Sequence, residues 1–147
     1  MNIKTKYLGE KEIEESSIIH FPFGLPGFPE EKQFALLDMP GNPVFQILQS
    51  INSQGTAFIV TNPYLFYRDY AFDLDDNLLE TLQIKDEKEV RVLTIVTVKD
   101  PFDTSTLNLK APLILNSRRN LGKQYILNTD IYPSKAAIAL SSAGKGE

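Results

Sequence analysis

The sequence predicts an all-β, mainly antiparallel fold: a compact, β-barrel-like single domain with one short helix. Three observations lead to this prediction. Apolar residues recur with a period of two in short runs, turns rich in Gly, Pro, Asn and Asp separate the runs, and only one stretch has helical spacing. The chain has 147 residues, 42% hydrophobic and 23% charged, which is ordinary usage for one globular domain.

The first half of the chain predicts a meander of strands. Residues 3–7 and 10–14 alternate on either side of Gly9 and predict a hairpin, and residues 17–21 form a third run. Three prolines and two glycines at 22–29 then stop strand continuation, because proline lacks a backbone donor. We expect an ordered loop there, pinned to the core by Phe23, Leu25 and Phe28. Further strands are expected at 33–37, 44–50 and 56–61, with turns at 40–43 and 52–55.

The second half continues the pattern around a single helix. Asp75 or Asp76 is suited to cap that helix, and Leu78, Leu79 and Leu82 recur at three- and four-residue spacing. Strands are expected at 70–74, 89–98, 105–109, 112–116 and 124–128. We expect the domain to span residues 1–133 and a tail to span 134–147, with its small, polar last seven residues disordered.

Composition excludes several classes of function. Nineteen acidic residues against 15 basic ones give a net charge of −4, which argues against direct nucleic-acid binding. The absence of cysteine excludes disulfides, thiolate nucleophiles and iron–sulfur clusters. The first residues lack the apolar core of a signal peptide, and no window approaches the roughly 18 apolar residues of a membrane span. We therefore expect a soluble, cytoplasmic protein without a membrane partner.

The residues for catalysis or metal binding are also missing. His20 is the single histidine, and its apolar run indicates a half-buried strand residue rather than a triad member. Phosphate-cradling glycine loops are absent. The acidic stretch 69–80 does not match a calcium loop, because Ala71 and Leu74 occupy positions that need an oxygen ligand and a glycine. No catalytic residue, metal or cofactor is expected.

One surface feature remains, the aromatic run at residues 62–70. Tyr, Phe and Arg are the usual anchors of protein-binding patches, and acidic neighbours steer a basic partner. The alternative is that half of these rings belong to the core and the others flank a loop.

Several blocks of the sequence resemble the family of the flagellar assembly factor FliW. They are Phe-Gly-Leu-Pro-Gly-Phe at 23–28, Phe-Gln-Ile-Leu-Gln-Ser at 45–50, Asn-Pro-Tyr-Leu-Phe at 62–66 with Asp69-Tyr70, and Ser-Thr-Leu-Asn-Leu-Lys-Ala-Pro at 105–112. The resemblance is collinear over residues 1–133. The family often ends on a basic, proline-containing segment, whereas this chain ends on an alanine-rich, glycine-ended tail.

This resemblance implies a non-enzymatic antagonist of the translational regulator CsrA that also binds flagellin. Flagellin holds the protein while flagellin accumulates in the cytoplasm. Once flagellin is secreted, the freed protein binds CsrA away from its RNA surface and relieves repression of the flagellin messenger. The switch needs no cofactor.

Two segments are the candidate binding surface. In the 45–50 strand neither face is cleanly polar, so apolar residues that are not buried in the core are available for contact with a partner. The alternative is a strand buried on both faces. In the 62–70 loop, Pro63 breaks the preceding strand. A Gln49→Lys change is expected to weaken CsrA binding without changing thermal stability. The candidate residues are Phe45, Ile47, Gln49, Ser50, Asn62, Tyr64, Phe66, Arg68, Asp69 and Tyr70.

Two other functions stay open. The first is a flagellin-binding chaperone without direct control of CsrA. The second is a ligand-binding β-barrel or an unrecognised enzyme, which a large polar-lined pocket would favour.

Overall fold

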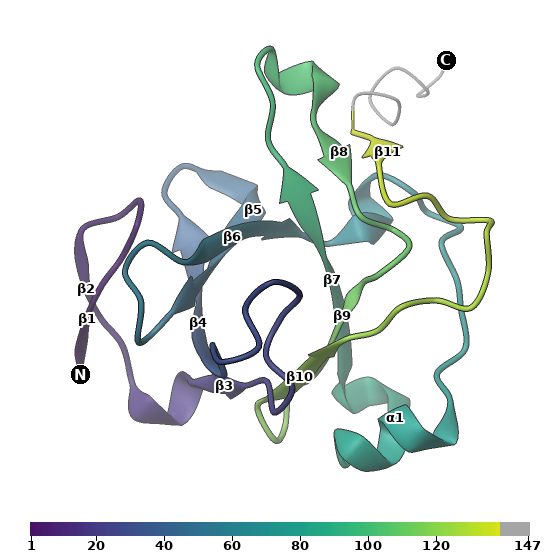
Figure 1. Ribbon diagram of the computed structural model, residues 1–147, viewed down its shortest axis with the longest axis horizontal. Coiled ribbons are helices and arrows are strands. Elements are labelled where there is room, and N and C mark those ends of the chain that lie inside the picture. The colour runs from purple at the N-terminus through teal and green to yellow at the C-terminus, as the bar shows by residue number, and fades with distance from the viewer. Residues whose placement is uncertain (139–147) are drawn as a thin grey trace.

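The computed structural model describes residues 1–138, and in them a large curled sheet dominates (Figure 1). Its strands are β3 (Ile19–His20), β4 (Gln33–Met39), β5 (Asn42–Ser50), β6 (Ala57–Thr61), β7 (Val90–Thr97), β8 (Thr106–Leu107), β9 (Leu113–Asn116), β10 (Leu121–Gln124) and β11 (Ala136–Ala137). A separate hairpin pairs β1 (Asn2–Lys4) with β2 (Glu10–Glu12).

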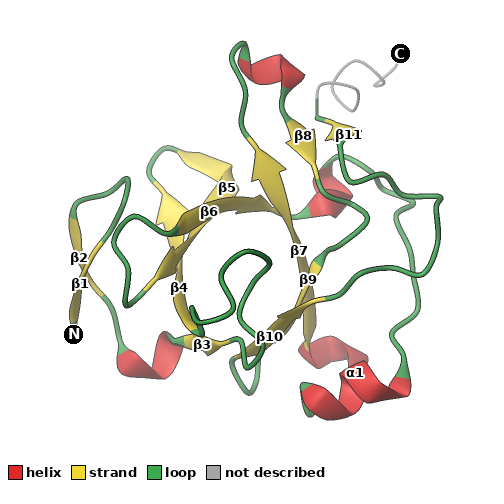
Figure 2. Ribbon diagram, in the orientation of Figure 1, coloured by secondary structure: helices red, strands yellow, loops and turns green. Residues whose placement is uncertain are grey.

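Helical structure is limited to short pieces, as Figure 2 shows in red. The α-helix is α1 (Asp76–Thr81), and the 3₁₀ turns are η1 (Glu15–Ser17), η2 (Pro63–Leu65), η3 (Glu87–Glu89) and η4 (Phe102–Thr104). The Asp75 side chain caps α1 by accepting a hydrogen bond from the Leu78 backbone N–H at 2.8 Å, as its position in the sequence predicts. Leu78 and Leu82 are buried against Ile114.

Seven strands of the sheet form a ring, which confirms the predicted barrel-like, mainly antiparallel fold. The order runs β7–β6–β5–β4–β3–β10–β9, and β9 pairs again with β7. One junction is weaker than the others, because β3 and β10 are parallel and meet at the single pair His20 and Leu121. The structure is therefore a curled sheet rather than a regular barrel. Beyond the ring, the end of β7 continues through β8 to β11.

Large apolar side chains fill the ring. Phe21, Phe34, Leu48, Leu93 and Leu113 are each at most 1% exposed and belong to one core cluster. The 21–32 loop curls into the ring (Figure 1). A second cluster packs outside the ring, between β4, β5 and the N-terminal hairpin.

The inward loop confirms one expectation and corrects another. Leu25 is 2% exposed and joins the core, and the ring of Phe28 makes an edge-to-face contact with Phe58 at 5.7 Å. Phe23, however, is 60% exposed, so the prediction that it pins the loop is wrong. Its ring lies instead under the Lys123 ammonium, 4.7 Å from the ring centroid.

Two predicted strands do not form as expected. Residues 70–74 contain no strand, because Tyr70, Phe72 and Leu74 pack on the outer side of the sheet without a pairing partner. The alternation of apolar and polar residues in this segment reflects the packing of side chains and not the pairing of a strand. The strand expected at 124–128 does not form: β10 (Leu121–Gln124) lies before it and shares only Gln124 with it. Beyond β10, Tyr125 and Leu127 still donate backbone hydrogen bonds to Pro112 and Lys110, each at 2.8 Å.

The chain remains folded beyond residue 133, where the domain was expected to end. β11 pairs with β8, and Ala136 and Ile138 are each 4% exposed in the outer cluster that contains Leu107. Short, small residues suit this packed position, although their composition indicated a tail. The seven final residues, for which disorder was expected, lie outside the described residues.

Candidate protein-binding surface

The structure buries all four residues predicted on β5, with Phe45 the least buried at 8% exposed. Ile47 is 1% exposed, and Gln49 and Ser50 are 0% exposed. The core covers one face of β5, and the N-terminal hairpin covers Ile47 on the other face through Ile3 and Ile13. The prediction that Ile47, Gln49 and Ser50 contact a partner is therefore wrong, and the alternative of a strand buried on both faces describes this part of β5.

Gln49 instead organises the turn that follows β5. Its Oε1 accepts a hydrogen bond from the Lys6 backbone N–H at 2.9 Å, which ties the N-terminal segment to the sheet. Its side-chain nitrogen donates to the carbonyls of Ser50 at 3.0 Å and Gln54 at 3.1 Å. A lysine here would break these hydrogen bonds, so from the structure we expect Gln49→Lys to lower thermal stability, in contrast to the expectation from the sequence.

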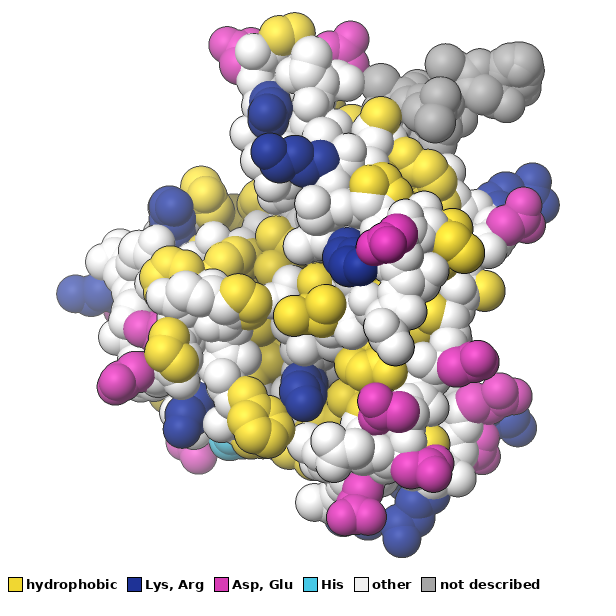
Figure 3. Space-filling model, turned by 45° about the vertical axis from the view of Figure 1, so that its right-hand side comes forward, with side chains coloured by type: hydrophobic (Ala, Val, Ile, Leu, Met, Phe, Trp, Pro, Cys, Tyr) yellow, Lys and Arg dark blue, Asp and Glu magenta, His cyan; other side chains and the backbone are white. Residues whose placement is uncertain are grey.

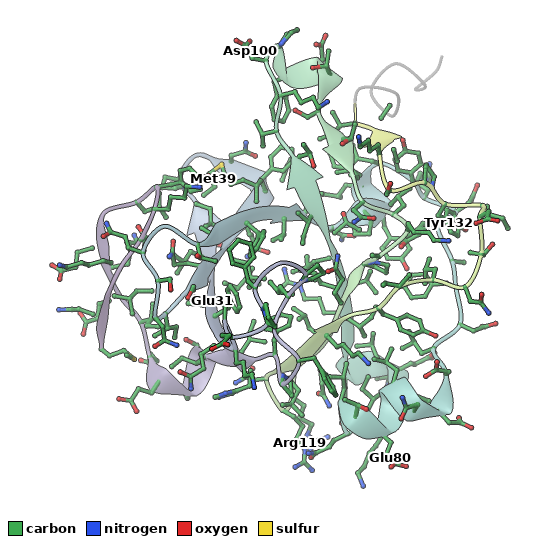
Figure 4. The ribbon with its side chains drawn as sticks, viewed as in Figure 1. Glu31, Met39, Glu80, Asp100, Arg119 and Tyr132 are labelled. Atoms are coloured by element: carbon green, nitrogen blue, oxygen red, sulfur yellow. The ribbon has the colours of Figure 1, made fainter. Side chains whose placement is uncertain are left out.

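Ser50 and Ser53 hold the carboxylate of Glu31. Both hydroxyls donate to it, the Ser53 bond at 2.6 Å. These hydrogen bonds, with the Ser50 bond the larger cause, hold the pKa of Glu31 below its ordinary value. Figure 4 labels Glu31, at the end of the loop that enters the ring. The role of Ser50 is therefore structural.

The fourth β5 residue, Phe45, brings the two predicted segments together. Its ring lies 6.3 Å from that of Phe66, which follows η2, and 5.6 Å from that of Phe102 in η4. Phe45 is 8% exposed, whereas Phe102 is 48% exposed. Three aromatic rings thus run from the buried side of the sheet to solvent.

Beside this aromatic row lies a hollow of about 420 Å³, which we call the apolar hollow. It lies between β4, β5 and the hairpin that rises from the end of β7, where Figure 4 labels Met39 and Asp100. Tyr7 and Val98 on its edge are each 52% exposed. Its lining residues are Tyr7, Met39, Asn42, Phe45, Ile59, Val98 and Phe102.

Sequence reasoning missed Tyr7, Val98 and Phe102, because they come from turns far apart in the chain. One local signal was present. Phe102 stands between Pro101 and Asp103 in Asp-Pro-Phe-Asp, where a large aromatic residue has no core role in a polar turn. An exposed aromatic residue at a hairpin tip is typical of a contact surface.

The 62–70 loop mixes structural and exposed residues. Asn62 caps η2, since its Oδ1 accepts a hydrogen bond from the Tyr64 N–H at 2.9 Å. Tyr70 is 3% exposed and its hydroxyl donates to the Leu109 carbonyl at 2.7 Å. Burial raises the pKa of Tyr70, so its phenol stays protonated and remains a donor. Tyr70 is thus a core residue, which corrects its prediction as a contact residue.

Tyr64, Arg68 and Asp69 are exposed, as a contact surface requires, and Phe66 is half-buried. Tyr64 borders a second hollow of about 560 Å³, together with Asn62, Phe72, Asp73 and Glu87 among others. We call it the acidic notch. Arg68 and Asp69 are not part of the lining of either hollow.

The acidic notch opens onto the most acidic part of the sequence. Residues 69–89 contain eight acidic and two basic side chains, a net charge of −6. Figure 3 shows acidic side chains gathered over this region, around α1. A surface of this kind attracts a basic partner and repels nucleic acid.

The described part of the chain contains no cluster of side chains suited to a metal ion. In residues 1–138, no group of three or more His, Asp or Glu side chains is placed to hold a metal ion. His20 is exposed on β3 rather than half-buried as predicted. No helix in these residues has the length and apolar character needed to cross a bilayer.

Comparison with known proteins identifies the family. The family model described as FliW protein matches residues 2–138. The chain belongs to the FliW family. The flagellar assembly factor FliW of Oceanobacillus iheyensis is 47% identical over 147 residues, which covers 100% of both chains. That of Bacillus subtilis strain 168 is 44% identical over 138 residues, which covers 94% of this chain and 96% of the relative.

A solved structure agrees with the fold. A crystal structure of the flagellar assembly factor FliW superposes with a TM-score of 0.89 at 46% sequence identity, and covers 94% of this chain and 96% of the other. The FliW assignment made from the sequence blocks is therefore confirmed, and so is the β-rich fold that it implied.

Proposed function

We propose that this FliW-family protein is a cytoplasmic flagellar assembly factor that antagonises CsrA. It binds CsrA away from the RNA-binding surface and lowers the affinity of CsrA for the flagellin messenger. Flagellin competes for the protein, so secretion of flagellin frees it. The names of the relatives supply flagellar assembly, and CsrA and flagellin come from the resemblance of the sequence blocks to this family.

The observation that carries the proposal is the apolar hollow with its exposed aromatic edge. Tyr7, Val98 and Phe102 hold apolar surface in water from the loops that follow β1 and β7, around a hollow that β4, β5 and β6 line with Met39, Phe45 and Ile59. Such central aromatic anchors supply most of the binding energy of a protein interface. The acidic notch adds attraction for a basic RNA-binding protein.

The switch follows from mass action. When flagellin occupies the protein, the concentration free to bind CsrA falls, and CsrA stays on RNA. When flagellin is secreted, the concentration of free protein rises. The protein then binds CsrA and lowers the affinity of CsrA for RNA. The switch between partners needs no chemical step. The apolar hollow is lined mainly by apolar and aromatic side chains, which suit binding.

The test is a titration of labelled flagellin leader RNA bound to CsrA. Added protein is expected to release RNA, and added flagellin is expected to reverse the release. If the affinity of CsrA for RNA falls to a constant lower value at saturating protein, the mechanism is allosteric. If the protein displaces RNA completely, as a competitor does, the protein and RNA share one surface on CsrA. Flagellin binding without RNA release would overturn CsrA antagonism and favour the flagellin chaperone instead.

A surface variant locates the contact. Phe102→Ser removes the ring at the edge of the apolar hollow and is expected to weaken partner binding about 30-fold or more, as loss of a central aromatic anchor does. Ile131→Ser is the matched control, since Ile131 is 77% exposed and outside the hollow. Equal affinities of the two variants would contradict a role for the apolar hollow, provided that both melt at the wild-type temperature.

A further inference from the structure

Three of the four arginines lie around one rim of the ring. Arg91 begins the inner face of β7, and Arg118 and Arg119 stand in the turn between β9 and β10, where Figure 4 labels Arg119. Arg118 is paired with Glu89 at 3.5 Å, and Arg91 also borders the acidic notch that contains Asp73 and Glu87. Of the three, only Arg91 lines a hollow of about 280 Å³, the rim hollow, whose walls also include Ile19, Leu36, Leu115, Asn116 and Asn120.

Arg91 is held in place by a relay of hydrogen bonds across three strands. Its guanidinium donates to Gln46 Oε1 on β5 at 2.7 Å, and Gln46 Nε2 donates in turn to Asp38 Oδ1 on β4 at 3.0 Å. Gln46 and Asp38 continue the inward-facing positions of Leu48 and Leu36. A fixed guanidinium loses little conformational freedom when it binds a ligand.

Arg91 makes no direct ion pair in the described part of the chain. The ion pairs in residues 1–138 are Lys110 with Asp130 and Arg118 with Glu89, and neither involves Arg91. The relay uses one N–H of the five that a guanidinium carries, and its acceptor is a neutral amide.

The other polar groups of the rim hollow are already bonded. The Asn116 side chain donates to the Leu82 carbonyl at 2.7 Å and accepts from the Arg118 backbone N–H at 3.0 Å. Asn120 donates to the Ser16 carbonyl at 2.6 Å. These groups build the walls, and Arg91 supplies the donors that remain for a ligand.

We propose that Arg91 in the rim hollow binds the side-chain carboxylate of a glutamate on a partner protein. The floor of Ile19, Leu36 and Leu115 suits the methylene groups of that side chain, and the guanidinium suits its carboxylate. Only the identity of the partner rests on the proposed function. A nucleic acid fits less well, because the volume holds one side chain and the acidic region of residues 69–89 repels a polyanion.

The test uses a small probe and needs no partner. N-acetyl-L-glutamic acid amide is titrated into the ¹⁵N-labelled full chain, and the side-chain signals of Arg91, Gln46 and Asn116 are followed by NMR. We expect saturable shifts with a dissociation constant of about 1–10 mM. The neutral glutamine analogue and the Arg91→Gln variant are expected to give no such shifts. Arg119→Gln removes a charge from the same rim outside the rim hollow, so it is expected to keep them.

Absence of saturable shifts in the wild-type chain would overturn the proposal. So would equal losses in Arg91→Gln and Arg119→Gln, because that result indicates attraction by net charge alone. Equal shifts with inorganic phosphate or an RNA oligonucleotide would show a general anion site instead. Gln46→Met keeps the charge but removes the relay, and it is expected to weaken probe binding several-fold.

The same variants then locate the glutamate. Arg91→Gln is expected to weaken the binding of either CsrA or flagellin about 10- to 100-fold, as loss of a charged hydrogen bond does, while Arg119→Gln changes it little. If the wild-type chain binds neither protein yet still binds the probe, the proposed function fails and the glutamate site stands. If it binds both proteins and Arg91→Gln binds them equally well, the glutamate contact is overturned and the proposed function stands.

Discussion

Replacing Gln49 with methionine is expected to destabilise the fold, although the two side chains have nearly the same length. Gln49 is fully buried and joins three parts of the chain: β5, the turn after it, and the N-terminal segment at Lys6. Methionine fills the space but neither accepts the hydrogen bond of the Lys6 N–H well nor donates to the turn carbonyls. The variant therefore isolates the hydrogen bonds from the packing.

The magnitude follows from the groups left without partners. The hydrogen bond from the Lys6 N–H is partly buried, so loss of its acceptor costs about 1–2 kcal/mol, and the lost bonds to the turn carbonyls contribute at most about 1 kcal/mol each. We expect the free energy of unfolding to fall by about 2–4 kcal/mol. For a chain of this length the melting temperature then falls by roughly 5–15 °C.

Urea unfolding followed by circular dichroism gives the free energy directly. Gln46→Met is the matched control, since Gln46 is on the same strand but makes its hydrogen bonds at the exposed rim, and its loss is expected to cost less than about 1 kcal/mol. The reasoning is refuted if Gln49→Met unfolds within about 0.5 kcal/mol of the wild type, or if the two variants are equally stable.

Two further variants test other parts of the fold. Glu31→Gln is expected to lower stability more at pH 7 than at pH 3. The pKa of Glu31 is lowered chiefly by the Ser50 hydroxyl, so its stabilisation is present above the unfolded-state pKa and is lost as pH falls through the folded-state value. Urea unfolding at both pH values measures this, and an equal difference at both contradicts it. Gly122→Ala is expected to lower the free energy of unfolding by about 1–3 kcal/mol through overpacking, because its Cβ would lie 2.7 Å from the Phe21 ring. Gly55→Ala is the control, since a Cβ at Gly55 meets open space. Equal melting temperatures for the two variants would contradict this.

The meander from β4 to β6 follows closely from local sequence. Strands expected at 33–37, 44–50 and 56–61 form at 33–39, 42–50 and 57–61. Turn residues such as Pro40 and Gly41 mark each reversal, and these signals are local. The single helix was found for the same reason, because capping and spacing both lie within a few residues.

The binding surface was less predictable because it depends on which elements cover each strand. The alternation of β5 shows a strand but does not show that the N-terminal hairpin covers its outer face, so Ile47 was assigned to a surface. The apolar hollow joins Tyr7, Phe45 and Phe102, and no local pattern relates these positions. Phe45 and Phe66 were named because each stands in a family block, and their contact with a partner stays a prediction.

The single contact between β3 and β10 has a consequence for synthesis of the protein. The ring closes only when His20 on β3 pairs with Leu121 on β10. Until β10 has been synthesised, the growing chain carries unpaired strand edges on β3 and β9. Contacts of such long sequence separation form slowly, and exposed edges favour association with other chains. The nascent protein is thus most exposed to aggregation just before β10 leaves the ribosome, and Gly122, which lets Leu115 and Phe21 meet across the junction, lies at the step that ends this exposure.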